Sequence, residues 1–159
     1  MGKSGQYKDQ EECAGMKYGY FDDKKREYVI TRPDTPAPWV NYLGDPEYGA
    51  IVSNNAGGYS FVKSGANGRI IRYRFNSNIG LPGRYIYIRD NDAKDYWSCT
   101  WQPVGKPLDQ YKTECHHGTA YTTIKSDYAD IHSELTYYVP LNKTYEVWRT
   151  KITNNSDRY

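Results

Sequence analysis

The sequence predicts an all-β chain folded as an antiparallel β-sandwich. Short segments in which apolar and polar residues alternate recur along the chain, and clusters of turn residues separate them. No stretch repeats apolar residues at i, i+3, i+4 and i+7, as an amphipathic helix requires. The 18 tyrosines, against three phenylalanines, agree with this fold class, because a tyrosine ring packs on a sheet while its hydroxyl stays polar.

The first strands are expected after a polar leader. Residues 1–15 lack periodicity and are predicted to be disordered, which leaves residues 16–159 as one β-sandwich domain. The strings MKYGYF and REYVIT flank a charged turn, a pattern typical of a β-hairpin. Alternation then predicts strands at 67–75 and at 83–90, where Ile86 and Ile88 lie opposite Tyr85 and Tyr87.

Five more strands are predicted in the second half of the chain. Residues 95–104 alternate so that Trp97, Cys99 and Trp101 share a face, and prolines at 103 and 107 close this strand. Strands follow at 111–117, 119–125, 131–140 and 144–153. In the segment 131–140, one face is predicted to carry the apolar side chains of Ile131, Leu135, Tyr137 and Val139.

Residues 39–59, WVNYLGDPEYGAIVSNNAGGY, have the composition of a binding surface. Three prolines precede them, so the chain enters this stretch extended. Aromatic and amide side chains alternate here with glycines, which permit close backbone approach. A flat ring beside an amide suits a sugar, and composition therefore indicates a polar, aromatic, sugar-facing surface.

Charge and cysteine content narrow the class of protein. A net charge of +2 with 25% charged residues gives no reason to expect a nucleic-acid or membrane partner. No apolar run approaches the roughly 20 residues of a membrane span, and the N-terminus lacks the apolar segment of a secretory signal. Three scattered cysteines do not suggest a disulfide framework, so a cytoplasmic protein is expected.

The sequence by itself shows no catalytic constellation and predicts no metal site. Of the Cys115-His116-His117 run, only Cys115 and His117 share a strand face, and two ligands are too few for zinc. The Asp90-Asn91-Asp92 segment is interpreted as a hairpin turn rather than a calcium loop.

Three alternating arginines leave two interpretations open. Arg69, Arg72 and Arg74 could clamp an anion, because a guanidinium matches phosphate geometry. A solvated sheet face is the more common use of alternating cations.

Eight strings, in one order, resemble a known family. They are MKYGYFDD, REYVITRPDTPAPWVNYLG, NNAGGYSF, RYRF, GRYIYIRD, YWSCTWQPV, HGTAY and YYVP. In this order they resemble the N-terminal region of the cellobiose and chitobiose phosphorylases, glycoside hydrolase family 94. The resemblance extends from Met16 to about Arg158, and two phrases, ITRPDTPAPW and DYWSCTWQPV, are closer to the chitobiose branch.

The resemblance implies an architecture and a reaction. Family members are cytoplasmic homodimers with an N-terminal supersandwich, a helical linker, an (α/α)6 barrel and a C-terminal β domain. They cleave a β-linked disaccharide with inorganic phosphate and invert the anomeric centre, giving an α-sugar 1-phosphate without a metal or organic cofactor. The catalytic Asp lies on the barrel, so the resemblance implies an incomplete sandwich without catalytic residues, from a parent that is an enzyme.

Seven positions match family motifs that could line a substrate site, although a purely structural role is equally open for each. They are Trp39, Asn41, Tyr42, Gly57, Gly58, Tyr59 and His117. The chain departs from the family at His116, where an arginine usually precedes the His-Gly pair. This departure puts any anion contact or interface pair at that position in doubt.

Two hypotheses of different class follow. In the first, the chain is the support domain of an inverting disaccharide phosphorylase, and the reaction takes place elsewhere in the parent. In the second, it is a free-standing carbohydrate-binding β-sandwich without catalytic activity.

Overall fold

The computed structural model describes residues 17–71 and 83–157, and none of these residues belongs to a helix. The predicted leader, residues 1–15, lies outside the described residues. The described residues form these strands: β1 (Gly19–Asp22), β2 (Glu27–Ile30), β3 (Val40–Gly44), β4 (Tyr48–Ser53), β5 (Gly58–Val62), β6 (Tyr87–Asp90), β7 (Asp95–Ser98), β8 (Lys112–His117), β9 (Tyr121–Tyr128), β10 (Ile131–Tyr138) and β11 (Val147–Asn154). Accordingly, the described part of the chain contains no helix that could span a membrane.

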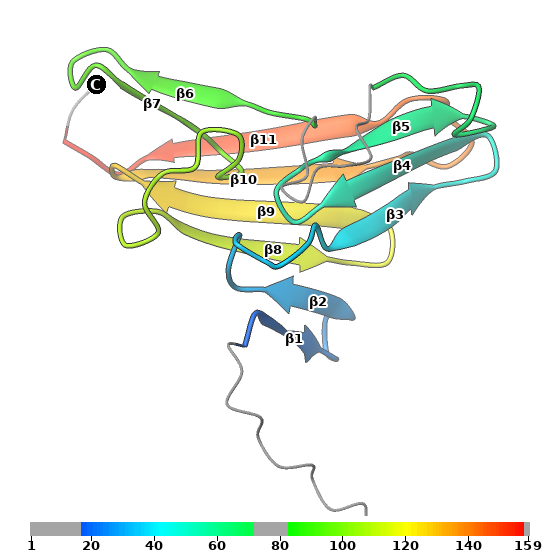
Figure 1. The fold of residues 1–159 in the computed structure, drawn as a ribbon, viewed down its shortest axis with the longest axis horizontal. Helices are drawn as coiled ribbons and strands as arrows, with labels where there is room; N and C mark the ends of the chain where they lie inside the picture. The colour runs from blue at the N-terminus through cyan, green and yellow to red at the C-terminus, as the bar shows by residue number, and fades with distance from the viewer. Residues whose placement is uncertain (1–16, 72–82, 158–159) are drawn as a thin grey trace, which may run out of the picture.

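The strands form two layers of antiparallel β-structure. One layer is a six-stranded sheet in the order β1-β2-β8-β9-β10-β11. The other consists of the three-stranded sheet β3-β4-β5 and the hairpin β6-β7, which lie towards opposite ends of the long strands of the large sheet (Figure 1). The predicted all-β, antiparallel sandwich is confirmed.

The core lies between the layers. The face of the six-stranded sheet that meets the second layer is called here the inner face. Its buried apolar side chains are Ile30, Cys115, Ile124, Leu135 and Tyr137, and they pack against Leu43, Tyr48, Ala50 and Val52 of the three-stranded sheet. The predicted apolar face of segment 131–140 is confirmed at Leu135 and Tyr137, each 1% exposed, and Val139 packs at the margin of this core.

The predicted strand over 95–104 ends early, at Ser98. Trp101 therefore does not lie on the face that it was predicted to share with Trp97 and Cys99. Trp97 and Cys99 are buried, but Trp101 has a φ of 65° and lies in a turn. The buried Tyr111 hydroxyl donates to Ser98 O (2.8 Å) and accepts from Trp101 N (3.0 Å). These two hydrogen bonds stabilise the turn after Ser98. Because the backbone is no longer extended there, side chains after Ser98 do not alternate between two faces.

Two other predicted strands are shortened. In the segment 67–75, Arg69 makes an isolated bridge to Phe61, and residues 72–75, with two of the three arginines, lie outside the described residues. In 83–90, Gly83 makes an isolated bridge to Gly57 and the strand itself begins only at Tyr87, so the alternation fails before it. Tyr85 therefore packs on the core with the two isoleucines, whereas Tyr87 is exposed.

Candidate functional site

An aromatic hollow brings together residues from three parts of the chain. It is lined by Phe21, Tyr28, Trp39, Val40 and His117, from the β1-β2 hairpin, β3 with the residue before it, and the end of β8. The Tyr28 and Trp39 rings lie 5.8 Å apart at 52°, and the Phe21 and Tyr28 rings lie 4.7 Å apart at 67°. These tilted contacts fix the rings and leave the hollow open to solvent.

Two adjacent asparagines position Trp39. Asn54 Oδ1 accepts from Trp39 N (3.1 Å), and Trp39 O accepts from Asn54 N (2.9 Å). The side-chain amides of Asn54 and Asn55 both donate to Pro33 O, at 3.2 and 2.7 Å. Both asparagines are buried, so they hold the extended proline segment against the end of β4 and orient the indole.

His117 is a neutral ring that fixes the floor of the aromatic hollow. Its Nε2 lies 3.0 Å from Trp39 O, and a carbonyl can only accept, so Nε2 carries the proton. Its Nδ1, 3.0 Å from Thr122 Oγ1, then accepts from that hydroxyl. Burial lowers the pKa of His117 below its ordinary value, although the bond to the Trp39 carbonyl partly opposes this.

Cys115 and His117 do converge as their spacing predicts. The thiol sulfur lies 3.8 Å from His117 Nδ1, and burial raises the pKa of Cys115. A protonated thiol and a ring with both nitrogens bonded offer little to a cation. Among the residues that the structure describes, no group of three or more His, Cys, Asp or Glu could hold a metal ion.

Asn41 joins the two layers and reaches Thr122 Oγ1, the partner of His117, at 3.2 Å. Its Nδ2 donates to Gly118 O at 2.8 Å and to Tyr121 O at 3.0 Å. Both amide hydrogens thus go to the β8-β9 turn rather than toward solvent. The geometry favours a positioning role for Asn41 over direct contact with a ligand.

The other four predicted site residues lie elsewhere on the three-stranded sheet. Tyr42 is 72% exposed, and it shares the outer side of this sheet with Tyr59, because both pair in register with Ile51. Gly57 and Gly58 are buried, and a Cβ on Gly58, whose φ is 119°, would lie 2.1 Å from Ile51 O. The seven residues therefore do not form one site: Trp39 and His117 border the aromatic hollow and Asn41 supports it.

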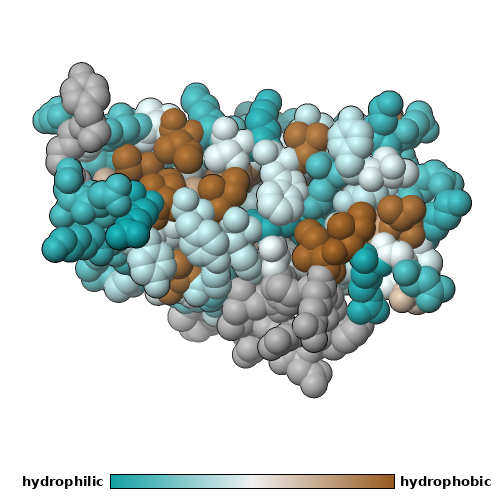
Figure 2. Space-filling model, turned by 90° about the horizontal axis from the view of Figure 1, so that it is seen from above, coloured by the Kyte–Doolittle hydropathy of each residue, from teal (hydrophilic) through white to brown (hydrophobic). Residues whose placement is uncertain are grey.

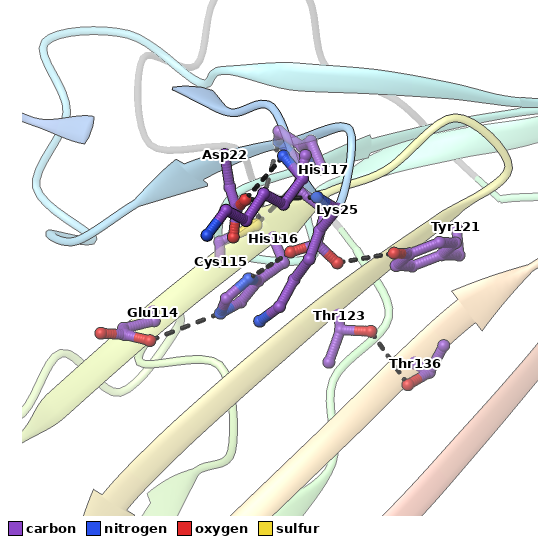
Figure 3. A network of polar contacts seen from close by, with 11 residues as sticks. Asp22, Lys25, Glu114, Cys115, His116, His117, Tyr121, Thr123 and Thr136 are labelled. Atoms are coloured by element: carbon purple, nitrogen blue, oxygen red, sulfur yellow. Dashed lines mark hydrogen bonds and ion pairs between the residues drawn. The ribbon is translucent and has the colours of Figure 1, made fainter. Parts of the chain in front are cut away.

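A carboxylate, an imidazole and a phenol meet on the other face of the six-stranded sheet, called here the outer face (Figure 3). Glu27 Oε1 accepts from Tyr121 Oη (2.6 Å), and Glu27 Oε2 lies 2.9 Å from His116 Nδ1. His116 Nε2 faces Glu114 at 3.4 Å, without the geometry of a hydrogen bond. Burial tends to raise the pKa of Glu27, but hydrogen bonds from Tyr121 and His116 outweigh it, so the pKa is lowered overall.

An ion pair that sequence reasoning missed lies inside the sandwich. Arg84 is fully buried, and its guanidinium binds Glu146 through two hydrogen bonds, Nε to Oε1 (2.5 Å) and Nη2 to Oε2 (2.8 Å). Its Nη1 donates to Ile51 O at 3.1 Å. The pair joins the segment before β6 to the segment before β11, and the alternation of GRYIYIRD contains no signal for a partner 62 positions away.

Comparison with protein families identifies the domain type that this chain matches. The model of the glycosyl hydrolase 94 supersandwich domain matches residues 26–159. That range begins in the turn before β2 and includes the aromatic hollow except Phe21, the Arg84–Glu146 pair and the contacts of Glu27 with His116 and Tyr121.

Comparison with characterised proteins gives similar full-length relatives. An N,N'-diacetylchitobiose phosphorylase of Vibrio proteolyticus is 49% identical over 90% of this chain, and one of Vibrio furnissii is 48% identical over 90%. A solabiose phosphorylase of Paenibacillus borealis is 30% identical over 89%. The chain spans 18% of the length of each of these relatives.

Proposed function

The chain belongs to the glycosyl hydrolase 94 supersandwich family, and we propose that it is the N-terminal support domain of an inverting disaccharide phosphorylase. The observation that carries this proposal is the match over residues 26–159, together with relatives at 49% and 48% identity that are phosphorylases. The parent is proposed to act in the cytoplasm as a homodimer, with inorganic phosphate as co-substrate and without a metal or organic cofactor.

The proposed reaction breaks a β-glycosidic bond with phosphate. A carboxylic acid protonates the glycosidic oxygen while a phosphate oxygen attacks the anomeric carbon from the opposite face, which yields an α-sugar 1-phosphate and a free sugar. Glu27 and Glu146 are unsuited to this acid role. Both carboxylates are at least nine-tenths buried and already bound to a cationic or phenolic partner. The chain spans 18% of the length of these relatives, and we propose that the catalytic acid lies in a part of the parent that this chain does not span.

We propose N,N'-diacetylchitobiose as the disaccharide, because the two relatives at 48–49% identity carry that name while solabiose phosphorylase is only 30% identical. The aromatic hollow is proposed to contribute a sugar contact through Trp39 and Tyr28. A ring fixed on two sides offers a flat apolar surface to the C–H face of a pyranose.

The test is phosphorolysis by the complete parent protein. Incubated with phosphate and either diacetylchitobiose, cellobiose or laminaribiose, it is expected to release N-acetylglucosamine 1-phosphate from the first, detected as an α-anomeric phosphate by NMR. Hydrolysis that does not depend on phosphate, or no cleavage of any of the three, would contradict the proposal.

A free-standing carbohydrate-binding sandwich is the second candidate. The aromatic hollow favours it, because five described residues of this chain line it. Saturable binding of disaccharide by a parent that lacks phosphorolysis would support this candidate over the first.

A further inference from the structure

A second hollow lies at the opposite edge of the six-stranded sheet, where β11 begins. Its lining includes Tyr48, Ser60, Ile70, Tyr145, Glu146 and Trp148, and it is called here the Trp148 hollow. Figure 2 views the molecule from the side on which β6 and β11 lie uppermost in Figure 1. On this face hydrophobic residues occur in separate groups among hydrophilic ones (Figure 2).

The Trp148 ring is held in one orientation although 40% of the residue is exposed. Its Nε1 donates to Glu146 Oε1 at 2.7 Å, and its ring meets the buried Tyr137 ring at 6.2 Å and 67°. Most exposed tryptophans lack such fixed neighbours. A ring that is ordered before binding loses little entropy when a ligand stacks on it.

The floor of the Trp148 hollow is polar and electrically balanced. The Glu146 carboxylate is neutralised by the buried Arg84 guanidinium, so the pair brings no net charge to the site. Glu146 Oε1 accepts two hydrogen bonds, from Arg84 and Trp148, while Oε2 accepts from Arg84.

Two hydroxyls complete this floor. Ser60 Oγ and the Tyr48 hydroxyl are buried neighbours, and Ser60 Oγ has no well-formed hydrogen bond to any described group. Burial raises the pKa of Tyr48, so its phenol stays protonated and can donate. A fixed ring, a carboxylate oxygen and hydroxyls in an uncharged site suit a ligand with one apolar face and a rim of hydroxyls.

We propose that the Trp148 hollow binds one pyranose unit of a neutral carbohydrate, with the C–H face of the sugar on the Trp148 ring. The sugar hydroxyls meet Glu146 Oε2 and the Tyr48 and Ser60 hydroxyls. This site lies outside the aromatic hollow, since the two share no lining residue. The inference rests on the proposed carbohydrate function but requires neither catalysis nor the aromatic hollow.

The test uses the natural full-length protein labelled with 5-fluorotryptophan. The fluorine NMR signal that disappears in Trp148→Phe identifies Trp148, and the signal that disappears in Trp39→Phe reports on the aromatic hollow. Titration with N-acetylglucosamine and with N,N'-diacetylchitobiose is expected to shift the Trp148 signal saturably. Inorganic phosphate alone is expected to leave that signal unchanged.

Variants test whether the shift reports direct stacking. Ser60→Ala removes a hydroxyl from the floor and leaves the Arg84–Glu146 pair and its bond to Trp148 in place, and it is expected to weaken the affinity measured at the Trp148 signal by about tenfold. Tyr87→Ala, which removes a similarly exposed tyrosine from β6, serves as the matched control and is expected to leave the affinity unchanged.

Several outcomes would overturn the inference. A Trp148 signal that does not move with either sugar contradicts it, as does one that moves with phosphate alone or equally in a non-carbohydrate control such as glycerol. Failure of the proposed function is read separately, from the absence of phosphorolysis. A shift at Trp39 without one at Trp148 would support the aromatic hollow and reject the Trp148 hollow.

Discussion

The two faces of the six-stranded sheet surround their side chains with different groups, as the consecutive residues His116 and His117 show. His117 points to the inner face, where its ring is neutral and both nitrogens bond to groups of the sandwich. His116 points to the outer face, between the carboxylates of Glu27 and Glu114. The alternation of a single strand therefore separates a histidine bonded within the sandwich from one that lies between two carboxylates.

Beyond His116, the outer face carries alternating charges from strand to strand. In register across β8, β9, β10 and β11 lie Glu114, Lys125, Glu134 and Lys151. Opposite charges directly across an antiparallel pair stabilise it weakly, and water screens them. The inner face, in contrast, buries apolar side chains, and the Arg84–Glu146 pair lies inside the sandwich, so we expect substitutions there to act mainly on folding.

The largest effect should come from breaking the buried ion pair. Arg84→Met leaves Glu146 buried without its cation, and it should lower the free energy of unfolding by about 3–5 kcal/mol. Urea unfolding of this chain measures it. The double variant Arg84→Met/Glu146→Leu is the matched control, because it removes both charges and should recover much of the loss. A loss below about 1 kcal/mol for the single variant would contradict the account.

An apolar truncation on the inner face should have the next largest effect. Leu135→Ala removes a side chain that is 1% exposed and should cost about 2–5 kcal/mol. Glu134→Ala, one residue away on the outer face, is the control. Urea unfolding measures the loss in the free energy of unfolding for both variants. Equal losses would contradict the proposed difference between the two faces.

Sequence periodicity was sufficient to predict that Leu135 and Tyr137 lie on the buried face of β10. This strand pairs on both sides, and its residues alternate without interruption. It could not predict Arg84–Glu146 or Glu27–Tyr121, whose partners lie 62 and 94 positions apart. Alternation assigns a face but not a partner on a distant strand. It also failed at Trp101, where a hydrogen-bonded turn replaces the expected extension of β7.

The candidate site was predicted only in part for the same reason. Trp39 and His117, two of the positions that match family motifs, come together at the aromatic hollow. Gly57 and Gly58 are buried, and Tyr42 is exposed on the outer side of the three-stranded sheet, outside the lining of the hollow.

Acidification should lower the stability of the folded chain in two steps. The pKa of His117 is lowered in the folded state, so unfolding takes up a proton once the pH falls below about 6.5, and stability decreases from there. His117→Asn should lose this first decrease, whereas His132→Asn should keep it. Unfolding midpoints at pH 7.5 and pH 5.5 provide the comparison. An unchanged decrease in His117→Asn would contradict the neutral, buried ring.

A second decrease is expected at lower pH, from carboxylates. Lys106 lowers the pKa of Asp95, Arg32 that of Asp34, and the Tyr121 and His116 hydrogen bonds lower that of Glu27 against the effect of burial. Their stabilisation is present above the unfolded-state values near 4 and is lost as the pH falls through the lower folded-state values. Glu27→Gln should reduce this second decrease.

The smallest effect is expected from the alternating charges of Glu114, Lys125, Glu134 and Lys151 on the outer face. Lys125→Gln should change the free energy of unfolding by less than about 1 kcal/mol, and high salt should reduce the effect further. Thermal unfolding at low and high salt measures it. A loss as large as that of Leu135→Ala would show that the outer face is held together as strongly as the inner one.

The central claim is that this chain folds as a support and that catalysis lies elsewhere in the parent. The most direct measurement compares this chain with the complete protein at equal concentration, in diacetylchitobiose and phosphate, after a cooperative thermal transition has shown that the chain is folded. The account predicts α-sugar 1-phosphate from the complete protein and none from the chain. Phosphate-dependent release of sugar 1-phosphate by the chain alone would contradict it.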